Sequence, residues 1–180
     1  MEVLLTPIEG LKIIKPKVFE DGRGYFYESW NKDVFSNAGI NTEFIQDNQS
    51  LSQKNVLRGL HFQNPPFAQA KLVRVIKGAV LDVALDLRKV SPTYGKSFTL
   101  ELTEANKQML FIPEGFAHGF LTLADDTIFS YKCSAPYNKA SEGCIDWNDP
   151  DLSISWNVDH PQLSEKDKLG QAFKGFISLF

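Results

Sequence analysis

The sequence contains few cysteines and histidines, no long apolar run and no excess of positive charge. Its two cysteines, Cys133 and Cys144, form no CxxC pair, so we expect reduced thiols and no thiolate zinc site. No apolar run approaches the roughly 20 residues that cross a bilayer, and the first residues lack the features of a signal peptide. The net charge of -3 argues against nucleic-acid binding through overall charge. We therefore expect a cytoplasmic protein with no nucleic-acid or membrane partner.

The length and composition predict one domain with a β-rich core. A chain of 180 residues is one domain's worth, and it contains no internal repeat, low-complexity tract or linker. Hydrophobic residues make up 43% of the chain, an ordinary share for a globular protein. Aromatic residues reach 12%, with 14 Phe, which is typical of a core built from strands. We predict a single domain over residues 1–180.

Alternating apolar and polar residues predict several strands in the middle of the chain. Residues 97–103 place Phe98, Leu100 and Leu102 on one face and polar residues on the other, so we expect one buried and one wet face. Residues 81–88 alternate in the same way. Further short strands are predicted over 57–63, 71–77, 109–112, 120–123 and 127–133. Strands about ten residues apart indicate an all-β sandwich or barrel.

Helical patterns are few and lie near the ends of the chain. Asn31 is a suitable cap for a short helix that stops at Gly39, and Ser164 for another over residues 165 to about 173. The sequence therefore predicts a β-sandwich or jelly roll with short peripheral helices.

Two of the three histidines are candidates for a functional site. His61 lies in the predicted strand 57–63, where Gly59 on the same face leaves room for a neighbour, and Arg58 is predicted on the opposite face. His118 follows a Pro-x-Gly turn that is expected to present the imidazole at the start of a strand. His160 is interpreted as a solvated turn residue, and a structural role remains an alternative for the other two.

Three cations lie close to His61 in this slightly acidic chain: Arg58, Lys71 and Arg74. A cation on an inward strand face is costly unless an anion meets it, so a pocket for phosphate or a developing oxyanion would explain them. The alternative is that they lie on an outward, wet face.

The turn before His118 is similar to one that metal-binding jelly rolls, the cupins, use. Such sites also need an H-x-H pair and a carboxylate on an earlier strand, whereas His61 stands alone and residue 63 is Gln. We therefore expect no metal site.

Six short motifs in order resemble those of one family, the dTDP-4-dehydrorhamnose 3,5-epimerases, over nearly the whole chain. The motifs are DGRGYF (21–26), QDNQS (46–50), LRGLHFQ (57–63), KLVRV (71–75), PEGFAHGF (113–120) and LSEKD (163–167). The resemblance implies a jelly-roll (cupin-like) barrel, a homodimer, and catalysis without metal or cofactor. It also implies inversion of C3 and C5 of dTDP-4-dehydro-6-deoxy-D-glucose through an enolate, giving dTDP-4-dehydro-L-rhamnose for dTDP-rhamnose biosynthesis.

The resemblance assigns four catalytic residues. His61 is the implied base, because an imidazole titrates near neutral pH, and Asp167 is implied to orient it. Tyr131 is the implied proton donor, and Lys71 stabilises the enolate oxygen. The residues alone leave alternatives open: a helix capping box from Ser164 to Asp167, and a packed core aromatic for Tyr131.

The resemblance also implies a set of substrate-binding residues. An arginine in a glycine-flanked turn can bind a diphosphate, amides suit the edge of thymine, and an aromatic ring can stack on a base. For the first two residues of the set the alternative is a surface ion pair. The set comprises Arg23, Glu28, Gln46, Asp47, Asn48, Arg58, His118, Tyr137, Glu142 and Lys166.

Other functions remain open from the sequence. A relative that inverts C3 alone, or a ketoisomerase acting on a related dTDP-4-keto sugar, would share these motifs. A metal-dependent oxygenase would need the missing H-x-H pair. A sugar-nucleotide binding protein without catalysis is the last alternative.

Overall fold

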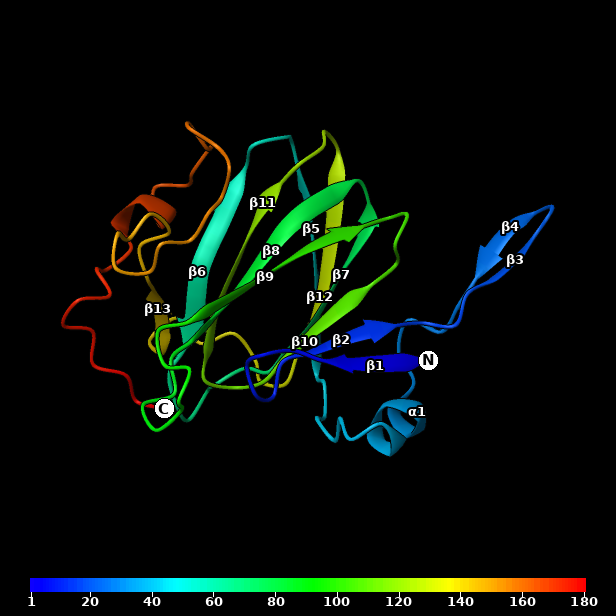
Figure 1. Cartoon of the computed structure of the whole chain (residues 1–180), viewed down its shortest axis with the longest axis horizontal. Coiled ribbons are helices and arrows are strands. Elements are labelled where there is room, and N and C mark those ends of the chain that lie inside the picture. The colour runs from blue at the N-terminus through cyan, green and yellow to red at the C-terminus, as the bar shows by residue number, and fades with distance from the viewer.

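The computed structural model describes all residues 1–180 as two antiparallel sheets packed face to face into a barrel (Figure 1). In spatial order, the six-stranded sheet contains β1 (Glu2–Leu5), β2 (Lys12–Lys15), β10 (Met109–Ile112), β7 (Lys71–Lys77), β12 (Thr127–Cys133) and β5 (Gln46–Ser52). The five-stranded sheet contains β13 (Glu142–Cys144), β6 (Leu57–Gln63), β11 (Phe116–Thr122), β8 (Ala79–Asp86) and β9 (Ser97–Thr103). The prediction of an all-β jelly-roll (cupin-like) barrel is confirmed.

Apolar side chains from both sheets fill most of the barrel interior. Val73 and Val75 of β7 and Phe129 of β12 meet Ala84 of β8 and Phe120 of β11 in one buried cluster. Alternate residues of each strand contribute, as the pleat requires. Burial of such side chains contributes about 1.5–3 kcal/mol each to folding.

Both sheets are also covered on their outer faces. The C-terminal segment, orange to red in Figure 1, lies beside β6 and β13, and its Leu152 and Trp156 join the cluster on that face of the five-stranded sheet. On the six-stranded sheet, Phe35 of helix α1 (Lys32–Asn37) packs against Leu72 and Met109. The α1 helix is capped by Asn31, as predicted.

The prediction of one wet face holds for β9 but is wrong for β8. Strand β9 has the expected wet face, with Thr99 and Glu101 exposed. Strand β8 does not, because Asp82 and Asp86 are both fully buried. Its leucines face the C-terminal segment, and its carboxylates lie on the opposite face, which is also enclosed. The alternating pattern of β8 therefore corresponds to two buried faces, one apolar and one polar.

Three predicted boundaries differ. The strand predicted over 81–88 is β8, which runs over Ala79–Asp86. The strand predicted over 120–123 begins earlier, because β11 runs from Phe116 and includes His118. The helix predicted over 165–173 is only a 3₁₀ turn, Asp167–Leu169. Gly170 follows it with a non-helical backbone, and glycine is needed there because a Cβ would lie 2.7 Å from the Asp146 backbone.

A short hairpin extends away from the barrel. It consists of β3 (Phe19–Asp21) and β4 (Gly24–Phe26), and Figure 1 shows it projecting past the rest of the molecule. All six strand residues are exposed. The only α-helix is six residues long, and no helix is long and apolar enough to cross a membrane.

Candidate active site

One end of the barrel interior is a polar cavity. Along β7 the inward residues change from Val75 and Val73 to Lys71, and along β12 from Phe129 to Tyr131. The cavity is lined by residues of both sheets and of nearby loops: Gln46, Asn48, His61, Phe62, Gln63, Gln69, Lys71, Tyr131, Tyr137 and Glu142. Convergent polar groups in a concave site are typical of a ligand-binding pocket.

A second hollow adjoins this cavity. His61, Lys71 and Tyr131 line both, and so form the boundary between them. The second hollow is completed by Gln49, Ser50, Arg58, His118 and Phe120. Three of the four predicted catalytic residues therefore lie around one common space.

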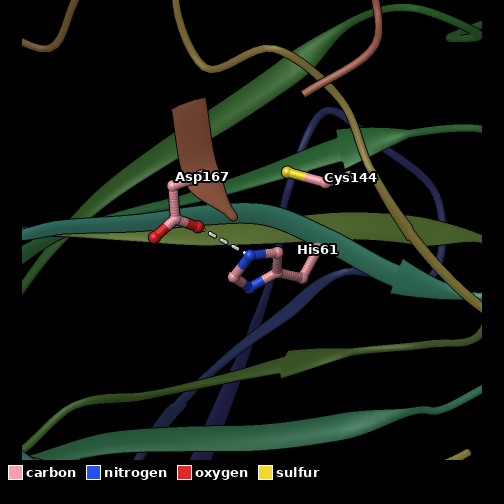
Figure 2. Close-up of side chains that lie close together, drawn as sticks. All are labelled: His61, Cys144 and Asp167. Atoms are coloured by element: carbon pink, nitrogen blue, oxygen red, sulfur yellow. Dashed lines mark ion pairs between the residues drawn. The ribbon is translucent and has the colours of Figure 1, made fainter. Parts of the chain in front are cut away.

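The fourth predicted residue, Asp167, contacts His61 from behind. Its Oδ1 atom lies 2.7 Å from His61 Nε2, and Asp167 is only 3% exposed (Figure 2). The two atoms are within ion-pair distance, but Nε2 has no hydrogen-bond partner of good geometry. The arrangement places a carboxylate against the imidazole, as the resemblance implies.

Asp167 is held as a carboxylate by its neighbours. Its Oδ1 accepts a hydrogen bond of 3.1 Å from the Gly59 N–H, and its Oδ2 accepts one of 2.6 Å from the Ser164 hydroxyl. Burial raises the pKa of Asp167, but the contacts with His61, Ser164 and Gly59 outweigh it and lower the pKa to about 2. Asp167 contacts both Ser164 and His61, so the capping box with Ser164 and the orientation of His61 are compatible interpretations of this residue.

Gly59 leaves room for a close neighbour, as expected, and the neighbour is a strand. Its φ is +133°, and a Cβ on it would lie 2.5 Å from the Gly119 Cα of β11. The space beside Gly59 is therefore filled by a neighbouring strand and not by a ligand. This close approach aims the Gly59 N–H at Asp167.

Arg58 shares the hollow with His61, although strict alternation predicts opposite faces. The pairing of β6 with β11 shifts register between His118 and Phe120, and such an irregularity breaks the alternation. Leu57 lies two residues before Gly59, so strict alternation would put it on the face of His61, but it packs under the C-terminal segment instead. Arg58 donates two hydrogen bonds to the Ser52 hydroxyl, at 3.2 and 3.1 Å.

Lys71 and Tyr131 lie together on the six-stranded sheet. The Lys71 Nζ is 5.9 Å from the centroid of the Tyr131 ring. Burial lowers the pKa of Lys71 and raises the pKa of Tyr131. The phenol therefore keeps its proton at neutral pH and can donate it.

His118 lies inside β11, not in a turn, and it is 6% exposed. Its Nε2 is 2.9 Å from Oδ2 of the fully buried Asp82 on β8. Burial lowers the pKa of His118 more than Asp82 raises it. His118 pairs in register with His61, so two histidine–carboxylate contacts lie on adjacent strands.

The cavity mouth holds several of the predicted binding residues. Gln46 and Asn48 alternate along β5 and are joined by a 3.0 Å hydrogen bond, and Gln46 Oε1 also accepts from the Tyr137 N–H. The Tyr137 hydroxyl donates to Glu142 at 3.0 Å, and Lys166 forms an ion pair with the same carboxylate.

Other predicted site residues lie away from the cavity. Arg23 is on the projecting hairpin and pairs with Asp21, with its side chain 90% exposed, while Glu28 accepts from Asn31. The alternative considered for Arg23, a surface ion pair, is therefore observed with Asp21 as the partner, whereas Glu28 makes a hydrogen bond and no ion pair. Asp47 faces outward and pairs with Lys132 at 2.9 Å. Their binding roles stay predictions.

Arg74 does not join the predicted cation cluster. It lies on the outer face of β7, where it donates to the Tyr27 hydroxyl at 3.1 Å. An odd spacing of three residues from Lys71 puts the two side chains on opposite faces of a strand. His160 is exposed, as expected for a solvated turn residue.

Comparison with known proteins identifies the family of this chain. A family profile described as dTDP-4-dehydrorhamnose 3,5-epimerase matches residues 5–175. The dTDP-4-dehydrorhamnose 3,5-epimerase of Shigella flexneri is 52% identical over 174 residues, covering 96% of each chain.

This chain belongs to the dTDP-4-dehydrorhamnose 3,5-epimerase family.

Solved structures agree with this epimerase over almost its full length. The crystal structure of the epimerase from Elizabethkingia anophelis NUHP1 has a TM-score of 0.92, 50% identity and 97% coverage of both chains. A dTDP-6-deoxy-D-glucose-3,5-epimerase from Legionella pneumophila Philadelphia 1, solved with dTDP-4-keto-L-rhamnose, has a TM-score of 0.92 and 44% identity, and covers 96% of this chain and 93% of its own.

Sequence reasoning missed several residues around the site of this epimerase. Gln63 and Gln69 line the cavity, Asp82 contacts His118, and Cys144 lies beside the His61–Asp167 contact. Asp82 could have been found, because a carboxylate in a strand with apolar neighbours on both faces needs a buried partner. For Cys144 the sequence carries no signal, since its proximity to Asp167 depends on the C-terminal segment.

Proposed function

We propose that His61 is the base with which this enzyme inverts C3 and C5 of dTDP-4-dehydro-6-deoxy-D-glucose, giving dTDP-4-dehydro-L-rhamnose. The names of its relatives and the dTDP-4-keto-L-rhamnose in the Legionella pneumophila structure support this substrate class. The observation that carries the proposal is that His61 and Tyr131 line the same cavity from opposite sheets. Inversion needs a base on one side of a sugar ring and an acid on the other.

Proton removal requires a neutral imidazole that becomes a cation. The C4 ketone acidifies the hydrogens at C3 and C5, so His61 takes the proton while the C–H electron pair moves toward the C4 oxygen. Asp167, an ionised and buried carboxylate 2.7 Å away, stabilises the imidazolium that results.

The developing enolate oxygen needs positive charge beside it. Lys71 lies between the two hollows, and Arg58 adds a second cation in the same space. In a cavity of low dielectric such groups act more strongly than in water. His118, which faces the second hollow, is proposed to contact the same part of the substrate.

Tyr131, which lies on the other sheet, then donates its proton to the substrate carbon. The resulting phenolate regains a proton from solvent. Its raised pKa makes it a reservoir of one proton at neutral pH. The imidazolium of His61 returns its proton to solvent before the second centre reacts.

The cavity mouth suits the nucleotide. The amides of Gln46 and Asn48 can pair with a thymine edge, the 56%-exposed Tyr137 ring can stack on the base, and Lys166 can reach a phosphate by leaving Glu142.

A second copy of the chain would complete the nucleotide site. Arg23 and Glu28 lie on or beside the projecting hairpin, away from the cavity of their own chain (Figure 1). The hairpin also exposes the large apolar residues Phe19, Tyr25 and Phe26. We therefore propose a homodimer in which each hairpin contacts the partner, and Arg23 reaches the diphosphate there. Two unbridged cysteines support a cytoplasmic location.

The test is proton exchange in heavy water. We expect deuterium at both C3 and C5 of the product, because each centre is reprotonated from groups that equilibrate with solvent. His61→Asn should lower turnover by about 10²–10⁴-fold or more while substrate affinity is retained. Label at C3 alone would assign a single-centre epimerase, a carbonyl moved to C3 in the product NMR spectrum would assign a ketoisomerase, and label at neither carbon would refute the proposal.

A further inference from the structure

Cys144 is the one nucleophilic side chain beside the catalytic pair that the proposed mechanism does not use. It lies on β13, in register with His61 on the neighbouring β6. Figure 2 shows its sulfur next to the contact between His61 and Asp167. One ligand atom from each of the three residues lies within 4.8 Å of the others.

The three donor types match a thiophilic divalent cation. Imidazole nitrogen, thiolate sulfur and carboxylate oxygen are all zinc ligands, with bonds of about 2.0–2.3 Å. Tetrahedral ligands at such distances lie roughly 3.3–3.7 Å apart, so side-chain shifts of about 1 Å would accommodate the ion. The Nε2 atom is buried and neither Cys144 nor Asp167 lines the cavity, so the cation would lie on the side of the imidazole away from the substrate.

The existing contacts also favour the cation. The buried Nε2 atom of His61 has no well-aligned hydrogen-bond partner. Asp167 is ionised and is oriented by Gly59 and Ser164, two groups that would remain in place. The Cys144 thiol makes one weak contact, with the Ile145 carbonyl at 3.6 Å.

We propose that His61, Cys144 and Asp167 form a binding site for Zn²⁺ or a similar thiophilic cation, and that its occupation inhibits the enzyme. The cation replaces the thiol proton, which is released to solvent, and takes the Nε2 lone pair of His61, so the single imidazole proton lies on Nδ1 and the ring cannot accept a second one from the substrate. No electron transfer is involved. The binding itself is independent of the reaction, whereas the inhibition rests on the proposed role of His61 as the base.

Binding is tested with Co²⁺, a spectroscopic substitute for Zn²⁺, on tag-free protein. The wild type should give a near-ultraviolet thiolate-to-cobalt charge-transfer band that Zn²⁺ abolishes by displacement. Cys144→Ala and Cys144→Ser should lack the band and keep the wild-type circular dichroism spectrum. Cys133→Ser is the matched control, since it removes the other thiol, and it should keep the band. Absence of the band in the wild type, or its persistence in Cys144→Ala, would overturn the site.

Inhibition is tested by Zn²⁺ titration of turnover. Wild-type activity should fall with added Zn²⁺ and return with chelator. Cys144→Ala should retain basal turnover, but it should need at least about 10-fold more Zn²⁺ for the same loss of activity. The reason is that removal of even a supporting group typically weakens metal binding 10–100-fold. If Zn²⁺ displaces cobalt at this site but turnover is unchanged, the metal site stands and the proposed inhibition is refuted, while the His61→Asn and heavy-water experiments decide the role of His61.

Discussion

In the proposed mechanism, Tyr131 and His61 act on the substrate from different sheets of the barrel. The phenol is held near Lys71, and burial raises its pKa, so it remains a proton donor at neutral pH. The imidazole faces the same cavity from the five-stranded sheet and is backed by Asp167. Each of the two proposed roles therefore follows from a different local environment.

Replacing Tyr131 by Phe should separate proton exchange from inversion. The variant keeps His61 and Lys71, so it should still remove a proton and return a solvent deuteron to the same face. Inverted product should fall by about 10²–10⁴-fold, as expected for loss of a general acid. The measurement compares deuterium in recovered substrate with formation of product by NMR. Loss of exchange and inversion to the same extent would contradict separate roles for the two residues.

Asp86, the last residue of β8, stabilises the connection that follows this strand. Asp86 is fully buried, and it accepts hydrogen bonds from Arg88, Ser91 and Thr93. Burial raises the pKa of Asp86, but these hydrogen bonds lower it to about 2. Asp86 is not among the residues that line the cavity, so its contribution concerns stability.

Asp86→Asn should therefore be a stability variant with a defined pH dependence. The folded-state pKa lies below the unfolded value of about 3.9, so the carboxylate stabilises the protein above that pH by about 2 kcal/mol. This contribution is lost as the pH falls toward 2. Urea unfolding should show a constant gap between wild type and variant from pH 7 to 5 that shrinks below about pH 4. Unchanged turnover is the control, and an equal gap at pH 3 and pH 7 would contradict the assignment.

At the scale of the whole molecule, we propose that the nucleotide site is shared between two chains. The cavity is built within one chain, but the hairpin that carries Arg23 projects away from it (Figure 1). In the proposed dimer every complete site combines His61 of one chain with Arg23 of the partner.

Mixed dimers test this arrangement. Arg23→Ala and His61→Asn should each be impaired alone, but a heterodimer contains one site with both native residues. Random mixing by co-expression should restore about a quarter of wild-type activity, since half the dimers are mixed and each has one intact site. Sedimentation of the wild type provides the oligomeric state. No recovery in verified heterodimers would show that Arg23 acts within its own chain or not at all.

The strands and the order of motifs could be read directly from the residues. Strands β6, β7, β9, β10 and β12 have the predicted bounds, because period-two patterns and turn residues are local properties. Likewise Asn31 caps α1 through its own side chain. The family followed from six ordered motifs, and comparison confirmed it.

The tertiary structure decided the rest, because these features depend on residues that are distant in the chain. The face of β8 predicted to be wet, which carries Asp82 and Asp86, is buried opposite the face that the C-terminal segment covers, and the neighbour that Gly59 leaves room for is β11. The register shift between β6 and β11 turns Arg58 into the hollow beside His61. Cys144 meets Asp167 only because β13 and the 3₁₀ turn pack against the same strand. Local sequence specifies which face a side chain prefers, but only packing specifies what lies opposite it.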